Sequence, residues 1–192
     1  MLNDDAEKPP AGRNRLVELR PPVEADAQDL FPLLKGTSVT DTLAWDGPLS
    51  LTEYRRGLHE RGAQVAAGLK HFFTIVEVGS GRAIGSCDVR LDEDGSRAMM
   101  GLWIGEPYQG KKLGTAVIAE LASYAFETLG VNRLEAEVFV GNLRSRRAFE
   151  RNGFVLLQTN PAAVVKRGVP VDEWRLGLER EAWERRTTSL SP

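Results

Sequence analysis

Hydrophobic residues change their spacing on either side of residues 109–115. Before this stretch, residues 99–105 are almost all apolar, which predicts a buried strand. After it, apolar residues recur at steps of three and four, as on one face of an amphipathic helix. They are Leu113, Val117, Leu121, Tyr124 and Ala125. Gly130 is expected to end this helix near Leu129, so the chain predicts a strand, a glycine-containing basic turn and a helix.

The same periodicities predict the other elements. Strands are predicted at residues 16–20, 72–76, 83–91, 99–105, 134–140, 154–157 and 174–178. Helices are predicted at residues 25–34, 50–67, 113–129 and 142–151. Ser50 and Glu53 form a capping-box pattern, and Asn142 is placed to cap the last helix. Residues 37–48 are expected to form a loop, and residues between the last two strands a polar hairpin. The order is β-α-α-β-β-β-α-β-α-β-β, which indicates an α+β fold.

Length and composition indicate one domain. The 192 residues, of which 42% are hydrophobic, can bury a sizeable core, and we assign it to residues 14–178. Residues 1–13 are polar and proline-rich and are expected to be a disordered lead-in. Residues 179–192 mix both charges and are expected to be a polar, frayed tail.

Charge and cysteine content narrow the class of protein. The formal net charge is −2, so bulk charge gives no reason to expect nucleic-acid or membrane binding. No apolar run approaches the ~18 residues of a membrane-spanning helix. The single cysteine, Cys87, fits a reducing compartment, and a cytoplasmic location is expected.

The basic turn at residues 109–115 has the chemistry of an anion site. A strand-to-helix junction directs free backbone N–H groups and the positive end of the helix dipole at one point. Gly110 and Gly114 allow close approach of a phosphate, and Lys111 and Lys112 add positive charge. The alternative is that the glycines serve only a tight turn and the lysines are solvated.

The turn resembles the pyrophosphate loop of the GNAT (GCN5-related N-acetyltransferase) superfamily, whose pattern is Gln/Arg-x-x-Gly-x-Gly/Ala. Gln109 and Gly114 occupy its first and last positions. Lys112 stands where the central glycine is usual, and a lysine there is costly only if its φ is positive.

Further motifs resemble the ribosomal-protein alanine N-acetyltransferase (RimJ/RimL)-like branch of this superfamily. They are residues 15–21, residues 101–111, Asn142-x-x-Ser145, residues 151–154 and Gly168-x-x-x-Asp172-x-Trp174. The resemblance covers residues 14–178 and implies the GNAT fold, a mixed, mostly antiparallel central sheet flanked by helices.

The resemblance implies an acetyl-CoA-dependent N-acetyltransferase that moves an acetyl group directly to a primary amine through a ternary complex, without a metal. The acceptor would be a protein or peptide N-terminus or a small amine. The residues expected to bind acetyl-CoA are Leu102, Trp103, Ile104, Gln109, Gly110, Lys111, Lys112, Leu113, Gly114, Thr115, Asn142 and Ser145. Trp45 is expected to form a wall of the acceptor site.

Two catalytic residues are expected, Ser145 and His71. Many relatives place a tyrosine seven residues after the asparagine, but this chain has Phe149, which cannot donate a proton. Ser145 is then the donor to the departing thiolate, as in the ribosomal-protein branch, unless it only caps or bonds back to its helix. His71 is the expected base because an ordinary histidine pKa suits proton acceptance near neutrality. His59, Glu106 and a water relay remain alternatives.

The identity of the amine is left open by the sequence. Ribosomal-protein N-termini, other peptide amines, polyamines and aminoglycosides are all handled on this scaffold. The altered loop and the missing tyrosine also leave open a CoA-binding module without catalytic activity. A homodimer is neither required nor excluded.

Overall fold

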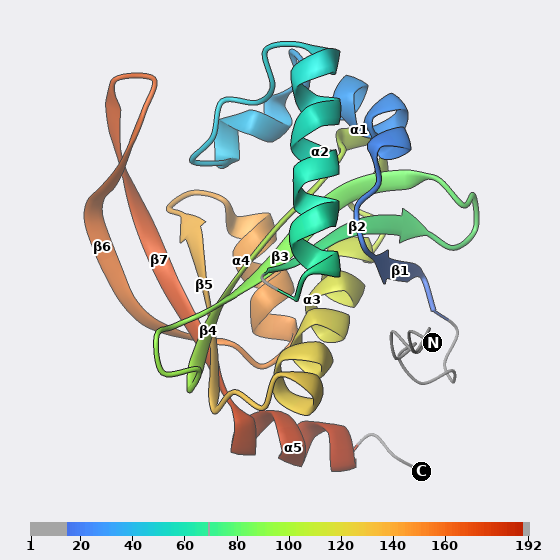
Figure 1. Ribbon diagram of the computed structural model, residues 1–192. Helices are drawn as coiled ribbons and strands as arrows, with labels where there is room; N and C mark the ends of the chain where they lie inside the picture. The colour runs from blue at the N-terminus through green and yellow to red at the C-terminus, as the bar shows by residue number, and fades with distance from the viewer. Residues whose placement is uncertain (1–14, 69, 190–192) are drawn as a thin grey trace, which may run out of the picture.

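One seven-stranded sheet runs through the residues that the computed structural model describes, which are residues 15–68 and 70–189 (Figure 1). Its order is β1-β2-β3-β4-β5-β7-β6, and every neighbouring pair is antiparallel except β4 and β5. The strands are β1 Val17–Arg20, β2 His71–Glu77, β3 Ala83–Leu91, β4 Arg97–Ile104, β5 Arg133–Phe139, β6 Val155–Lys166 and β7 Val169–Glu179. The predicted mixed, mostly antiparallel α+β sheet is confirmed.

Helices cover both faces of this sheet. They are α1 Ala27–Leu34, α2 Leu51–Ala66, α3 Leu113–Ser123, α4 Leu143–Arg151 and α5 Arg180–Ser189. Short 3-10 helices lie at η1 Glu24–Asp26, η2 Ser38–Thr42 and η3 Glu106–Tyr108, and a π-helical turn, Tyr124–Thr128, continues α3. Figure 1 shows α2 lying across the sheet.

The two faces of β4 bury their side chains in two different cores. Met100 and Ile104 pack in the larger core with α3, whereas Trp103 packs against the smaller core formed by α1 and α2. Side chains alternate across a strand, so one apolar strand can serve both layers. Each fully buried aliphatic side chain contributes roughly 1.5–3 kcal/mol, so the two cores together hold the helices on the sheet.

The parallel strands β4 and β5 are paired over only part of their length. Their register joins residues 97–100 of β4 to residues 133–136 of β5. Beyond Met100 the two strands separate, while β3 stays paired with β4 to Ile104 and β7 with β5 to Phe139. The sheet therefore has a gap at its centre, between the carboxyl ends of β4 and β5.

The predicted helix ends are largely confirmed. The Ser50 side chain accepts a hydrogen bond from Glu53 N, and Asn142 Oδ1 accepts one from Ser145 N. The capping box is only half formed, because the Glu53 carboxylate accepts from Leu49 N and not from Ser50. Gly130 has the expected positive φ of 75° after the π-helical turn.

The last two strands are longer than predicted. β6 continues to Lys166 and β7 begins at Val169, so most of the predicted polar hairpin is sheet. β6 is an edge strand and is exposed along most of its length, so its residues do not alternate in polarity as a half-buried strand requires. Residues 37–48 likewise contain the 3-10 helix η2 within the predicted loop.

The prediction of a frayed tail is wrong for residues 180–189, which form α5. The Trp183 ring packs on the Phe126 ring with centroids 5.2 Å apart. The Arg180 guanidinium donates hydrogen bonds to Phe126 O at 2.7 Å and Val131 O at 3.0 Å. This helix contains few apolar residues, so its sequence lacks the hydrophobic periodicity from which a helix is predicted. The predicted lead-in, residues 1–13, lies outside the described residues.

The described residues contain neither a membrane-spanning helix nor a cluster of metal-ligating side chains. No helix among them has the length and apolar character needed to cross a bilayer. No group of three or more His, Cys, Asp or Glu side chains in residues 15–68 and 70–189 is arranged to hold a metal ion.

Replacing Trp183 tests whether α5 is part of the folded unit. Trp183→Ala removes the ring that packs on Phe126 and should lower the free energy of unfolding by about 2 kcal/mol, less than a fully buried tryptophan would cost. Urea denaturation followed by circular dichroism measures the change. Glu181→Ala, on the exposed side of the same helix, is the control. Equal stabilities for both variants would contradict a docked α5.

Candidate functional site

The predicted basic turn joins β4 to α3 beside the gap in the sheet. Gln109 Nε2 donates a hydrogen bond to Ile104 O at 2.7 Å, which fixes the turn to the end of β4. Gly110 has a φ of 78°, and Leu113, the first residue of α3, is buried. The first N–H groups of α3 have no partners within the helix, so they and the helix dipole form the geometry of an anion site.

Lys112 adopts a strained conformation at this turn. It is the N-cap residue of α3, with φ 64° and ψ 1°, in the left-handed region that the usual glycine would occupy without strain. A side chain in this region costs about 1–2 kcal/mol. A lysine at this position was expected to be destabilising only if its φ is positive, and the φ of Lys112 is positive.

Gly114 has open space on its inner side. A Cβ built there would meet only Ile104 Cδ1, at 3.9 Å, so the fold itself does not require a glycine. Gly114 lines the cavity described next, and its missing side chain leaves the surface of that cavity free.

A cavity of about 350 Å³ fills the gap between β4 and β5. It reaches both faces of the sheet, because its lining includes α3 and α4 on one side and η2 on the other. Of the twelve residues predicted to bind acetyl-CoA, ten line it: Leu102, Trp103, Ile104, Gln109, Gly110, Lys112, Gly114, Thr115, Asn142 and Ser145. Lys111 lies instead over the Tyr108 ring, with Nζ 5.5 Å from the centroid, and Leu113 is buried.

Ser145 faces this cavity from the first turn of α4. Its backbone N–H is capped by Asn142, while its hydroxyl makes no hydrogen bond to any described residue. The alternative, in which the hydroxyl bonds back to its own helix, is thus not what the structure has. Phe149 is buried and packs edge-on against Phe154, with centroids 5.1 Å apart.

His71 lies on the face of β2 that α3 covers, and it is not among the residues that line the cavity. Its Nδ1 is 2.9 Å from the Tyr124 hydroxyl, and its ring and that of Phe73 both pack on Tyr124. Burial lowers the pKa of His71. The structure therefore does not bring the predicted base to the predicted proton donor.

The alternative bases, Glu106 and His59, do not line the cavity either. The Glu106 carboxylate accepts hydrogen bonds from Ser38 N at 2.8 Å and from the Ser38 hydroxyl. These bonds lower the pKa of Glu106 and tie η3 to η2. His59 is exposed on α2.

The loop after η2 is tied to the tip of the β6–β7 hairpin by charge. Lys166 Nζ lies 2.5 Å from Asp46 Oδ1 and donates to Trp45 O at 3.0 Å, and Arg167 pairs with Asp41 at 3.0 Å. The Trp45 ring stacks beside Tyr54, with centroids 6.5 Å apart, and does not line the cavity. Other residues of this segment do line it: Val39, Thr42, Leu43 and Ala44.

Two acidic residues of the cavity were not predicted. Glu137 of β5 and Glu173 of β7 both line it. Glu137 pairs with Arg175 at 2.8 Å, whereas Glu173 is only 7% exposed. The alternation at residues 135–137 could have indicated two carboxylates on one face of a strand, but Glu173 lies in residues read as a hairpin.

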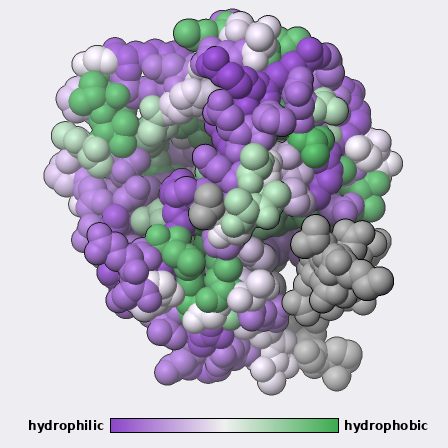
Figure 2. Space-filling model, in the orientation of Figure 1, coloured by the Kyte–Doolittle hydropathy of each residue, from purple (hydrophilic) through white to green (hydrophobic). Residues whose placement is uncertain are grey.

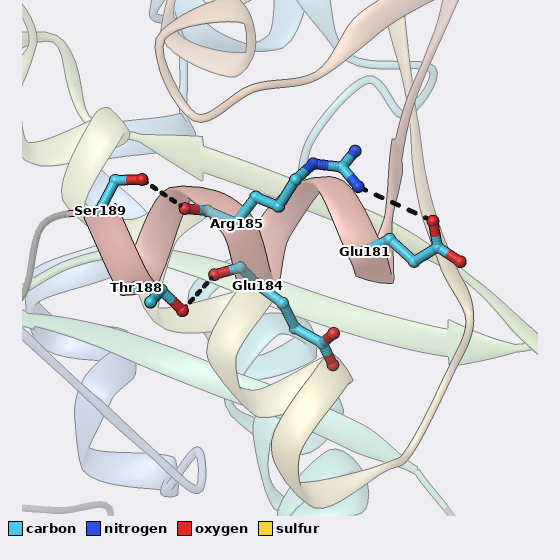
Figure 3. A pocket seen from close by; sticks show the side chains of 5 residues that line it. All are labelled: Glu181, Glu184, Arg185, Thr188 and Ser189. Carbon is cyan, nitrogen blue, oxygen red and sulfur yellow. Dashed lines mark hydrogen bonds and ion pairs between the residues drawn. The ribbon is translucent and has the colours of Figure 1, made fainter.

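The surface around the site is mostly polar. Figure 2 shows a predominantly hydrophilic face on which hydrophobic side chains form small separate groups, one at the upper left and another below the centre. Val165 and Val169 of the β6–β7 hairpin are among the exposed hydrophobic residues. A separate hollow on α5 is lined by side chains of that one helix, which bond mainly to one another and to its backbone (Figure 3). It brings no groups together from different elements.

Replacing Lys112 by glycine tests the strain at the turn. Lys112→Gly should raise the free energy of unfolding by about 0.5–1 kcal/mol, because glycine adopts a positive φ freely and its greater unfolded-state entropy offsets only part of the gain. Urea denaturation measures the change. Lys111→Gly, at a neighbouring residue without positive φ, is the control and should not be stabilised. A destabilised Lys112→Gly variant would refute the strain.

Comparisons with known proteins agree with this geometry. A family model described as acetyltransferase (GNAT) domain matches residues 16–155. A curated Bacillus subtilis (strain 168) protein, described as "Putative ribosomal N-acetyltransferase YdaF", is 42% identical over 65 residues. That match covers 34% of this chain and only 36% of the relative, so the chain spans about a third of its length. The similarity supports the predicted ribosomal-protein branch.

Solved structures share the fold. One described as "Probable acetyltransferase" has a TM-score of 0.78 and 26% identity over 88% of this chain and 96% of its own. The spermidine N-acetyltransferase from Vibrio cholerae, solved with CoA and spermine, has a TM-score of 0.77 and 17% identity over 89% and 99%. Because the family model matches well over half of the chain, as the loop and motifs predicted, the protein belongs to the GNAT acetyltransferase domain family.

Proposed function

We propose that the protein is an acetyl-CoA-dependent N-acetyltransferase that moves an acetyl group directly onto a primary amine within a ternary complex. The observation that carries this proposal is the single cavity that passes between β4 and β5 and reaches both faces of the sheet. Two substrates can enter such a cavity from opposite sides and meet in its middle, which is what direct transfer requires.

The α3 side of the cavity suits acetyl-CoA. The pyrophosphate would lie on the turn at residues 109–115, where the N-terminus of α3 and the open surface at Gly114 meet. The pantetheine would follow residues 102–104 of β4, whose edge is left without a partner strand once β5 has moved away. Lys112, Arg144 and Arg151 line the same cavity and add positive charge for phosphates.

The opposite side suits an amine. Glu137 and Glu173 line the cavity there, and carboxylates attract the ammonium form in which an amine arrives at neutral pH. The segment at residues 39–44 closes this side, and the β6–β7 hairpin is tied to Asp41 by Arg167 and to Asp46 by Lys166. Trp45 would contribute to this wall only if its ring turned from Tyr54.

Ser145 would assist departure of the thiolate. Its hydroxyl has no hydrogen-bond partner among residues 15–68 and 70–189, and it faces the cavity beside Asn142. A hydroxyl that donates to the sulfur as the C–S bond breaks stabilises the negative charge there. A covalent acetyl-enzyme is not part of the proposal, because Cys87 is 2% exposed and burial raises the pKa of its thiol.

Two alternatives remain distinguishable by experiment. A CoA-binding module without catalysis would bind acetyl-CoA but release no free CoA with any amine. The named relatives act on different amines: one is described as a ribosomal N-acetyltransferase and another as a spermidine N-acetyltransferase. A panel of peptides with free N-termini, polyamines and aminoglycosides, assayed by release of free CoA, separates these acceptors.

Gly114→Glu tests the cofactor site. The variant should lose measurable acetyl-CoA binding, because the new carboxylate fills the space at the N-terminus of α3 and repels the pyrophosphate. The fold should persist, since a Cβ at Gly114 meets only a side-chain methyl at 3.9 Å. Isothermal titration calorimetry measures the affinity. Gly57→Glu in α2, where a Cβ also meets nothing within 4 Å, is the matched control. Unchanged affinity in folded Gly114→Glu would exclude this site.

Ser145→Ala tests the proton donor. We expect kcat to fall by about 10²-fold or less, the low end for one acid–base group, with acetyl-CoA affinity nearly unchanged. Steady-state kinetics with an amine that turns over, together with calorimetry, separates the two quantities. Ser80→Ala, in the exposed β2–β3 turn, controls for the substitution. If rapid-quench data show that chemistry limits turnover and kcat is unchanged, the serine has no catalytic role.

A further inference from the structure

Glu173 is an unusual carboxylate for this molecule. It lies on β7 directly opposite Phe139 of β5, and the residue is 7% exposed. Within the described part of the chain its side chain makes no hydrogen bond and no ion pair. An acidic side chain is rarely buried without a partner, because removing its charge from water is costly. A group kept in such a place at a cavity is a candidate for function.

Burial and the neighbouring charges together determine the pKa of the Glu173 carboxyl group. Glu137, on β5, repels the Glu173 carboxylate, and Arg175, on its own strand, attracts it. Arg175 is engaged elsewhere, at 2.8 Å from Glu137 and 3.7 Å from Glu135. Burial and Glu137 outweigh Arg175 and raise the pKa of Glu173.

The remaining charged groups of the cavity do not neutralise Glu173. Arg90 of β3 reaches the cavity but is paired with Asp88 at 2.6 Å. Arg144 of α4 lines the cavity from the α3 side of the sheet. Asn160 of β6, the cross-strand neighbour of Glu173 on its other side, carries no charge.

Glu173 lines the cavity, whereas the candidate bases His71 and Glu106 do not. His71 lies on the face of the sheet that α3 covers, opposite the face of Glu173, and its ring is hydrogen-bonded to the Tyr124 hydroxyl. The Glu106 carboxylate accepts a hydrogen bond from Ser38 N. Of the two acids that line the cavity, Glu137 is held by Arg175. Glu173 therefore combines contact with the cavity, a free carboxylate and a position across the sheet from Ser145.

We propose that Glu173 is the general base that takes the proton from the acceptor's ammonium group, directly or through one water molecule. This role rests on the proposed acetyltransferase function. The ammonium gives one proton to the Glu173 carboxylate, and the neutral nitrogen attacks the thioester carbonyl carbon. The C–N bond forms and the C–S bond breaks.

The remaining protons balance through Ser145 and solvent. The thiolate takes the hydroxyl proton of Ser145, and the serine regains a proton from the nitrogen as it becomes an amide. The proton on Glu173 passes to water, which the open cavity admits. The products are the acetylated amine, CoA thiol and one released proton. A raised pKa favours this role, because a base is most effective when its pKa approaches the working pH.

The pH dependence of kcat/KM tests this assignment. Wild-type kcat/KM should fall as pH drops through the raised pKa of Glu173, since only the carboxylate accepts a proton. Glu173→Gln keeps the size but cannot titrate, so it should remove this lower limb and reduce kcat/KM by about 10²-fold or more. Suitable probes are spermidine, benzylamine and a short peptide with a free N-terminal alanine, each with acetyl-CoA.

A second variant separates a base from a merely structural carboxylate. Glu137→Gln removes the charge that raises the pKa of Glu173 and frees Arg175, so the lower limb should persist but move to lower pH. A limb that stays in place in Glu137→Gln, or that disappears in His71→Gln and not in Glu173→Gln, would overturn the assignment.

The outcomes also separate this role from the function on which it rests. A wild-type protein that binds acetyl-CoA but acetylates neither these probes nor any amine of the peptide, polyamine and aminoglycoside panel contradicts both. A protein that turns over, with the same pH profile in Glu173→Gln, keeps the function and refutes the base.

The pH dependence of thermal stability tests the state of Glu173 without any amine acceptor. A raised carboxyl pKa in the folded state means that ionisation of Glu173 destabilises the fold above its unfolded pKa of ~4.3. Glu173→Gln should therefore have a higher Tm than wild type at about pH 8, and this advantage should vanish near pH 4. No difference in Tm at either pH would contradict a buried, unpaired carboxylate.

Discussion

The separation of β4 from β5 is the constraint on which the site depends. The two strands are joined by a crossover through α3, and they pair for only four residues before they part. Each also keeps its outer neighbour, so the sheet stays continuous while its centre opens. Buried backbone N–H and C=O groups need hydrogen-bond partners, and those on the inner edges of the gap have none from the other strand. A ligand that enters the gap can therefore bond to these backbone groups.

The site holds two features that a sequence selected for stability alone would not keep. Lys112 adopts a positive φ beside the gap, and Glu173 is a buried carboxylate with no hydrogen bond or ion pair to the described part of the chain. Strained backbone and buried charge each destabilise the folded state and persist where the surrounding structure enforces them. Both lie on the same cavity, one on each side of the sheet. Elsewhere the buried acid Asp26 is fully bonded, to Arg20 and Thr74, and its pKa is lowered by those bonds in spite of its burial.

Local sequence signals predicted ten of the residues that line the cavity and missed Glu137 and Glu173, which also line it. The turn at residues 109–115, the cap at Asn142 and the serine at Ser145 each depend on neighbours within a few residues, so periodicity and motif were sufficient. Glu173 depends on pairing between β5 and β7, which are distant in sequence. His71 does not line the cavity, because the face of β2 on which its side chain lies is set by pairing with β3, which no local pattern reveals. α5 needed the contact of Trp183 with Phe126, which no local pattern reveals.

The cavity is polarised although the whole chain is nearly neutral. Its formal net charge of −2 gives no hint of a charged ligand. Within the cavity, however, Lys112 at the N-terminus of α3 and Arg144 and Arg151 of α4 supply positive charge. Glu137 and Glu173 lie on the face of the sheet opposite α3, where the one basic residue among the described lining residues is Arg90, paired with Asp88. On the proposed function, an anionic cofactor would be attracted to the basic side and a cationic amine to the acidic side. Such an arrangement would then select orientation as well as affinity, because on that function the two substrates would approach the same thioester from opposite faces. The gap in the sheet is what allows the two oppositely charged surfaces to share one cavity.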